Sequence, residues 1–68
     1  MDNTIRKVRT DDFVFVYNTT DGHLRITYED VDRDVTVILF AHEVLAMLEL
    51  LAECRETVYH KAQERRQQ

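Results

Sequence analysis

The segment from Val44 to Ala52 contains a single polar residue, Glu49. No proline or glycine interrupts the chain from Ala41 to Arg65, so the segment lies inside one long predicted helix. A helix that is apolar around most of its circumference needs cover on more than one side. A chain of 68 residues has little else with which to cover it. We therefore expect a second copy of the protein to supply the missing cover.

The length of the chain leads to the same expectation. A domain of this size buries only about 60% of its unfolded surface, and such a core rarely supplies more than ~3–5 kcal/mol without a disulfide, a metal or oligomerisation. The single cysteine, Cys54, excludes an internal disulfide, and the ligands of a structural zinc site are missing. Oligomerisation is what remains, and together with the apolar helix it predicts a homodimer. The lone cysteine and the absence of a long apolar run predict a cytoplasmic protein without a membrane partner.

The net charge of −4 is unevenly distributed. Residues 1–10 and residues 57–68 each carry +2, whereas residues 11–56 carry −8. Phosphate affinity grows with the number of positive contacts, so an acidic body with short basic ends does not favour general binding of nucleic acid. Ordinary solvated surface charge is the simpler interpretation.

Three segments have the length and composition of β-strands, namely residues 13–17, 23–29 and 34–40. Residues 1–11 form either a polar arm or a weak edge strand. We expect one α+β domain over residues 1–68, in which a three- or four-stranded antiparallel sheet (12–40) precedes one long helix (41–65) and a frayed tail (66–68). The helix packs on one face of the sheet.

The pair Asp21-Gly22 is a strong hairpin signal because glycine accepts a positive φ. A two-residue turn would pair Tyr17 with Ile26 and Phe15 with Tyr28, so that the larger side chains share one face. A three-residue turn with a bulge would instead align Val14 and Val16 with Leu24 and Ile26. The first register is our prediction.

At ~100° per residue, one stripe of the helix is continuously apolar and includes Cys54, which we expect to be buried and inert. Apolar residues on the flanks of this stripe, and the second apolar face of the first strand, are the candidates for a dimer or partner interface. These candidates are Leu45, Leu50, Tyr59, Val14 and Val16.

No catalytic, cofactor or metal site is predicted. His42-Glu43 starts like a zinc-binding H-E-x-x-H motif, but Ala46 stands where the second histidine is needed. The alternating acids of residues 30–34 resemble half of a calcium loop, without its glycine and bidentate glutamate. A chain this short barely forms a cleft, so we expect a protein that is not an enzyme.

The order of elements is similar to that of the single-stranded-DNA-binding transcriptional coactivator family. The similarity rests on an apolar strand, the Asp21-Gly22 turn, the strand containing Leu24-Arg25-Ile26, and a helix that follows Leu39-Phe40. It covers about two-thirds of the chain and includes no specific motif. The resemblance implies a dimer that binds single-stranded nucleic acid. The cations for such binding would be Arg6, Lys7, Arg9 and Arg25.

The function that these observations favour is different. We expect a small acidic interaction module whose partners are itself and another protein, acting as a regulator or inhibitor of a larger macromolecule, as phage-type inhibitors do. In one version the acidic body imitates the charge of nucleic acid. The contacts in that version would be Glu29, Asp30, Asp32 and Asp34.

Overall fold

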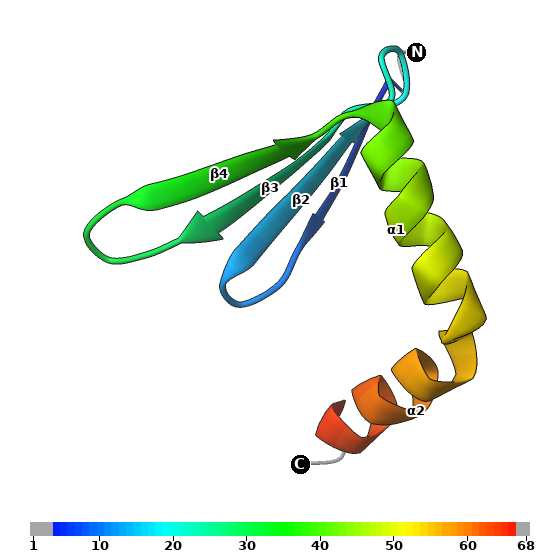
Figure 1. The fold of residues 1–68 in the computed structure, drawn as a ribbon. Helices are drawn as coiled ribbons and strands as arrows, with labels where there is room; N and C mark the ends of the chain where they lie inside the picture. Colours follow the sequence, from blue (N-terminus) through cyan, green and yellow to red (C-terminus); the bar gives the residue numbers. More distant parts are fainter. Residues whose placement is uncertain (1–3, 67–68) are drawn as a thin grey trace.

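The computed structural model describes residues 4–66, which form four antiparallel strands followed by two helices (Figure 1). The strands are β1 (Ile5–Arg9), β2 (Phe13–Asn18), β3 (Leu24–Glu29) and β4 (Asp34–Leu39). The helices are α1 (Ala41–Glu53) and α2 (Arg55–Arg66). The α+β class and the antiparallel sheet are as predicted.

The strands form one meander in the order β1-β2-β3-β4, so β1 and β4 are the two edges. The predicted sheet exists in its four-stranded version, because the segment Ile5–Arg9 pairs with β2 along its whole length. Residues 1–3 of the predicted N-terminal arm lie outside the described residues. Residues 67 and 68 of the predicted frayed tail also lie outside them, whereas Arg66, the first residue of that tail, is the last residue of α2.

The register between β2 and β3 differs from the predicted one by two residues. Tyr17 pairs with Leu24 and Phe15 with Ile26. The turn is longer than two residues, because the amide of Asn18 donates to the carbonyl of His23 (3.0 Å) across four intervening residues. A slip of two residues leaves every side chain on its face. The shared face of the larger side chains is therefore as predicted, although their pairs are not.

Directly paired residues of neighbouring strands point to the same side of a sheet, so the register defines two faces. The first, called here the apolar sheet face, consists of Val8, Phe13, Phe15, Tyr17, Leu24, Ile26, Tyr28, Val35, Val37 and Leu39, with Arg6 at its margin. The second, called here the polar sheet face, consists of Ile5, Lys7, Arg9, Val14, Val16, Asn18, Arg25, Thr27, Glu29, Asp34, Thr36 and Ile38.

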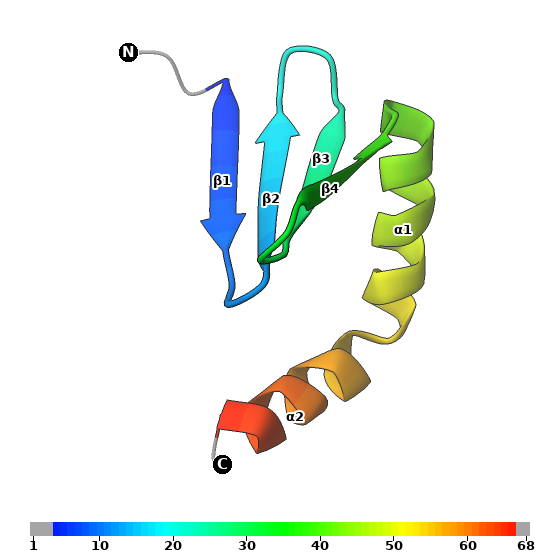
Figure 2. The same cartoon turned by 90° about the vertical axis from the view of Figure 1, so that its left-hand side faces the viewer.

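The prediction of one long helix is wrong, because the chain bends at Cys54. The backbone of Cys54 has φ −105° and ψ 19°, and its amide still reaches the carbonyls of Leu50 (3.3 Å) and Leu51 (3.2 Å). A bend of this kind needs neither proline nor glycine. The last turn of α1 contains no basic residue, and Glu53 lies at the C-terminal end of the helix dipole, where a negative charge weakens the helix. Seen in Figures 1 and 2, α1 and α2 form an arc on one side of the sheet.

Local contacts hold the junction between β4 and α1. The carboxylate of Glu43 accepts a hydrogen bond from the amide of Phe40 (2.9 Å), which closes half of a capping box at the start of the helix. Gly22, in the β2–β3 turn, has φ +78°, and a Cβ there would lie 3.0 Å from the Cβ of Ala41. Glycine therefore satisfies both the turn and its close contact with the first residue of α1.

The structure has almost no core within one protomer. Within residues 4–66, Val14 is the one buried apolar residue, with 8% of its surface exposed. The helices touch the sheet only weakly, near the junction with β4, and no side chain of α1 is buried. The protomer is thus an open arrangement of a sheet and two helices.

Candidate functional site

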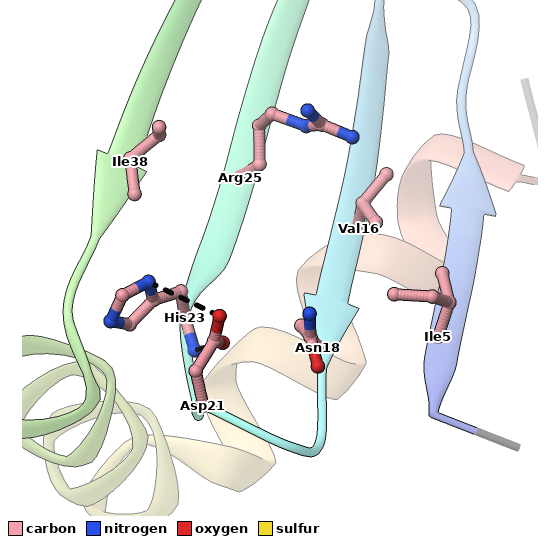
Figure 3. Close-up of a pocket in the computed structure, with 7 residues that line it drawn as sticks. All are labelled: Ile5, Val16, Asn18, Asp21, His23, Arg25 and Ile38. Atoms are coloured by element: carbon pink, nitrogen blue, oxygen red, sulfur yellow. Dashed lines mark hydrogen bonds and ion pairs between the residues drawn. The ribbon is translucent and has the colours of Figure 1, made fainter.

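The apolar sheet face is the first candidate interaction surface. It lies on the side of the helices, as Figure 3 shows by viewing the polar face with the helices behind the sheet. Its central residues are half-buried by their neighbours, and Phe13 and Tyr28 contact each other with ring centroids 5.3 Å apart. Towards the β4 edge the cover is lost, and Val35 and Val37 are 49% and 51% exposed. A strip of apolar surface on the side of the helices thus remains exposed.

The helices present a second apolar surface. Val44 and Met47 are half-buried, whereas Leu45 is 55% and Leu50 is 60% exposed. At the bend, the inner side of the arc forms a shallow apolar groove between the two helices. Its lining consists of Leu48, Leu51, Ala52, Arg55, Val58 and Tyr59.

Cys54 is exposed, and the expectation that it is buried on the apolar stripe is wrong for the single protomer. The arc of α1 and α2 stands away from the sheet, so the sheet does not cover the stripe near the bend.

The accessible surface gives the size of the uncovered area. A folded protein of 8.1 kDa exposes about 4,500 Å², whereas this chain exposes 6243 Å². The excess is roughly 1,700 Å², and a standard protein interface buries about 800 Å² on each partner. The protomer therefore has enough surplus surface for a complete interface.

The predicted interface residues divide between the two sides of the molecule. Leu45, Leu50 and Tyr59 are exposed on the helices. Val14 and Val16 are on the polar sheet face, where Val14 is already covered and has little surface left for a partner. The exposed residues that sequence reasoning missed are those of the apolar sheet face near β4. Their alternation is visible in the sequence, but it does not by itself distinguish a buried face from an interface.

The polar sheet face contains the clearest electrostatic contact. The guanidinium of Arg9 donates two hydrogen bonds to the carboxylate of Glu29, at 2.6 and 3.0 Å. The pair joins β1 to β3 across β2, above Val14, which pairs directly with Arg9 in the sheet. These hydrogen bonds, together with the charges of Arg9 and Lys7, hold the pKa of Glu29 below its ordinary value, and the same contact raises the pKa of Arg9.

The lowered pKa of Glu29 predicts a small dependence of stability on pH. A carboxyl with a lowered folded pKa stabilises the protein above its unfolded value, about 4.3, and this contribution disappears as the pH falls through the folded value. Wild-type protein should therefore lose more stability between pH 6 and pH 3 than Glu29→Gln does, as measured by urea midpoints at low salt. The difference should be small, because the pair is solvent-exposed.

The control for this experiment is Glu49→Gln, which removes an exposed carboxylate in the middle of α1 that makes no ion pair within residues 4–66. It should retain the wild-type pH dependence, and 0.5 M salt should reduce the contrast for Glu29. Equal slopes for wild type and Glu29→Gln would show that the ion pair has no role in stability.

The nucleic-acid candidates are only partly brought together. Lys7, Arg9 and Arg25 are on the polar sheet face and line one shallow groove with Thr27 and Thr36, whose hydroxyls are 3.1 Å apart. Arg6 is on the opposite face, because it pairs with Tyr17.

A second groove on the polar sheet face lies nearer the β2–β3 turn (Figure 3). Arg25 and Val16 belong to both grooves. At its end, Nδ1 of His23 is 3.6 Å from a carboxylate oxygen of Asp21, and the imidazole contacts the ring of Phe40 edge-on, with centroids 5.0 Å apart. The two grooves together run along the polar sheet face.

The acidic candidates lie at the far end of the sheet. Asp30, Asp32 and Asp34 are exposed in and beside the β3–β4 turn, whose tip, Val31, is fully exposed. Glu29 differs from them because its carboxylate is held by Arg9. Three acids at one end of the molecule therefore remain open to a partner.

Among the described residues, no group of three or more histidine, cysteine, aspartate or glutamate side chains could hold a metal ion. No helix in residues 4–66 has the length and apolar character needed to cross a membrane. No family model, curated protein or solved structure matches the chain significantly.

Proposed function

We propose that the protein is a non-enzymatic homodimeric interaction module, which regulates or inhibits a larger macromolecule by binding it. The observation that carries the proposal is the uncovered apolar surface of the protomer. No side chain of α1 is buried, and the chain exposes roughly 1,700 Å² more than a folded protein of its mass. Burying apolar surface is the main driving force of association, and a second copy offers the same surplus.

The dimer is tested by light scattering on the purified protein at micromolar concentration. A mass of twice 8.1 kDa is expected. A folded, cooperative monomer under these conditions would contradict the proposal. A protein that is soluble only when co-expressed with a different chain would indicate a subunit of a larger complex instead.

The charge distribution supports one mode of binding to the larger macromolecule, in which the acidic end of the sheet contacts the partner. Asp30, Asp32 and Asp34 are exposed there, and the body of the chain carries −8 over residues 11–56. A basic surface on another protein, such as one that normally binds nucleic acid, is complementary to this charge. The affinity for such a partner, identified by affinity purification, should fall steeply with salt. A salt-insensitive complex would remove the charge-mimicry version and leave the interaction module.

A second candidate function is binding of single-stranded nucleic acid. The observation that favours it is the groove of the polar sheet face, which collects Lys7, Arg9 and Arg25 from two strands that are not neighbours. Cations along a groove are the electrostatic part of a single-strand binding surface.

Gel shifts with single-stranded DNA and RNA at low salt test this candidate. If the groove binds, Arg25→Glu should weaken binding at least tenfold, because it reverses the charge shared by both grooves of the face. Arg33→Glu is the matched control, since it makes the same charge change in the β3–β4 turn, away from the groove. Absence of binding at tens of micromolar, the range of non-specific sites, would exclude the candidate.

A further inference from the structure

The two edges of the sheet differ in how well they are protected against pairing. The edge strand β1 carries Arg6, Lys7 and Arg9 within five residues, and charged side chains are a common device that keeps an edge from pairing. The edge strand β4 has the sequence Asp-Val-Thr-Val-Ile-Leu, with one charge at its first residue and neither proline nor lysine. Every residue of β4 except Leu39 is exposed. The β4 edge is thus long for this small sheet, apolar and open.

We propose that β4 pairs antiparallel with β4 of a second copy, about a two-fold axis that passes beside Val37. This inference rests on the proposed homodimer and specifies its interface. In this register Val37 lies opposite Val37 of the partner subunit, Val35 opposite the partner's Leu39, and Thr36 opposite the partner's Ile38. Each pair joins residues of one sheet face, so the apolar sheet face continues across the axis without a break.

Charge and closure of the assembly favour β4–β4 pairing over the other two ways in which the sheet edges of two copies can pair. Pairing of β1 with β1 of a second copy about the same kind of axis would place Lys7 opposite the partner's Lys7, with two further cations on each strand. Like charges directly opposite are destabilising. Pairing of β1 with β4 of a second copy is head-to-tail and leaves a free edge at each end, so it grows into an open chain. The β4–β4 contact closes at two copies and brings no like charges into opposition, because Asp34 lies opposite the partner's Phe40.

The position of α1 fits this arrangement. Its contacts with the sheet are with β4, the strand that would lie at the centre of the joined eight-stranded sheet. Both copies of α1 are then on the apolar side of that sheet and on either side of the axis. Exposed leucines of α1, Leu45 and Leu50 among them, find cover from the second helix and from the partner's strip of apolar sheet face. The β4–β4 contact thus covers both the exposed part of the apolar sheet face and the exposed leucines of α1.

The test is disulfide cross-linking in a Cys54→Ala background, which removes the single native thiol. Val37→Cys places two thiols directly across the axis, where opposite Cβ atoms are about 4.5–5.5 Å apart, close to the geometry of a disulfide. Val35→Cys is the matched control. It is on the same strand and face and is almost equally exposed, at 49% against 51%, but its two copies would be about 14 Å apart along the strands. Under mild oxidation, Val37→Cys should form covalent dimer at least ten times faster than Val35→Cys.

Light scattering on the reduced variants separates this inference from the proposed homodimer. A dimer in which Val37→Cys cross-links no faster than Val35→Cys would overturn the β4 contact and leave the homodimer in place. A monomeric wild-type protein would overturn both. The double variant Val35→Cys/Leu39→Cys gives an independent check, because the two thiols are opposite each other twice in the dimer. It should cross-link as fast as Val37→Cys, and failure to do so would contradict the proposed register.

Discussion

Replacing Leu45 with aspartate should convert the dimer into a monomer. Leu45 is 55% exposed in the protomer, so the substitution costs the single chain little. In the proposed dimer the same residue is covered, and burial of a leucine contributes about 1.5–3 kcal/mol per copy. Both copies change at once, so we expect a loss of about 3–6 kcal/mol, which raises the dissociation constant at least a hundredfold. Light scattering or sedimentation at micromolar concentration measures the change.

Ala46→Asp is the matched control for this substitution. It adds the same charge to the same helix, one residue further along, on the side marked by Glu49 and Glu53. It should leave the dimer intact, and circular dichroism should show that both variants keep their secondary structure. A dimer that survives Leu45→Asp would place the interface away from this flank of α1, and Leu50→Asp then tests the other flank.

The thermal midpoint should rise with protein concentration. Unfolding of a dimer separates two chains, so a hundredfold increase in concentration stabilises it by about 2.7 kcal/mol. The unfolding entropy of two 68-residue chains converts this into a rise of about 10 °C. Calorimetry or circular dichroism between 1 and 100 μM is sufficient to measure it.

The Leu45→Asp variant provides the internal reference for the thermal experiment. As a monomer, it should melt at one temperature regardless of concentration, and below the wild type. A wild-type midpoint that stays constant over the hundredfold range would show that folding and association are not coupled, and would remove the main support for the dimer.

The alternation of side chains correctly predicted which residues share a face of the sheet, but the predicted residue pairs between β2 and β3 were wrong. Phe15, Tyr17, Leu24, Ile26 and Tyr28 share one face, as their spacing indicated. The pairing itself is shifted by two residues, because the hydrogen bonds of the turn decide where the strands meet. Periodicity contains no information on loop length, and a shift of two residues is invisible to it.

The bend at Cys54 was also beyond prediction. The segment from Ala41 to Arg66 contains no residue that breaks a helix, and its apolar stripe continues through the bend to Val58. The bend changes the direction in which the apolar stripe faces, but it leaves no mark in the order of apolar and polar residues. It produces the arc whose inner groove contains Leu48, Leu51 and Tyr59, and it leaves Cys54 exposed.

Side-chain periodicity and composition were sufficient to predict the element types, the two faces of the sheet and the excess of apolar helix surface. The fold was needed to show that β1 joins the sheet, that Lys7, Arg9 and Arg25 share a groove while Arg6 does not, and that the edge at β4 remains open. These properties depend on which strands pair and in which register. Pairing is a relation between distant segments, so its outcome follows from hydrogen bonds across the sheet rather than from any local pattern.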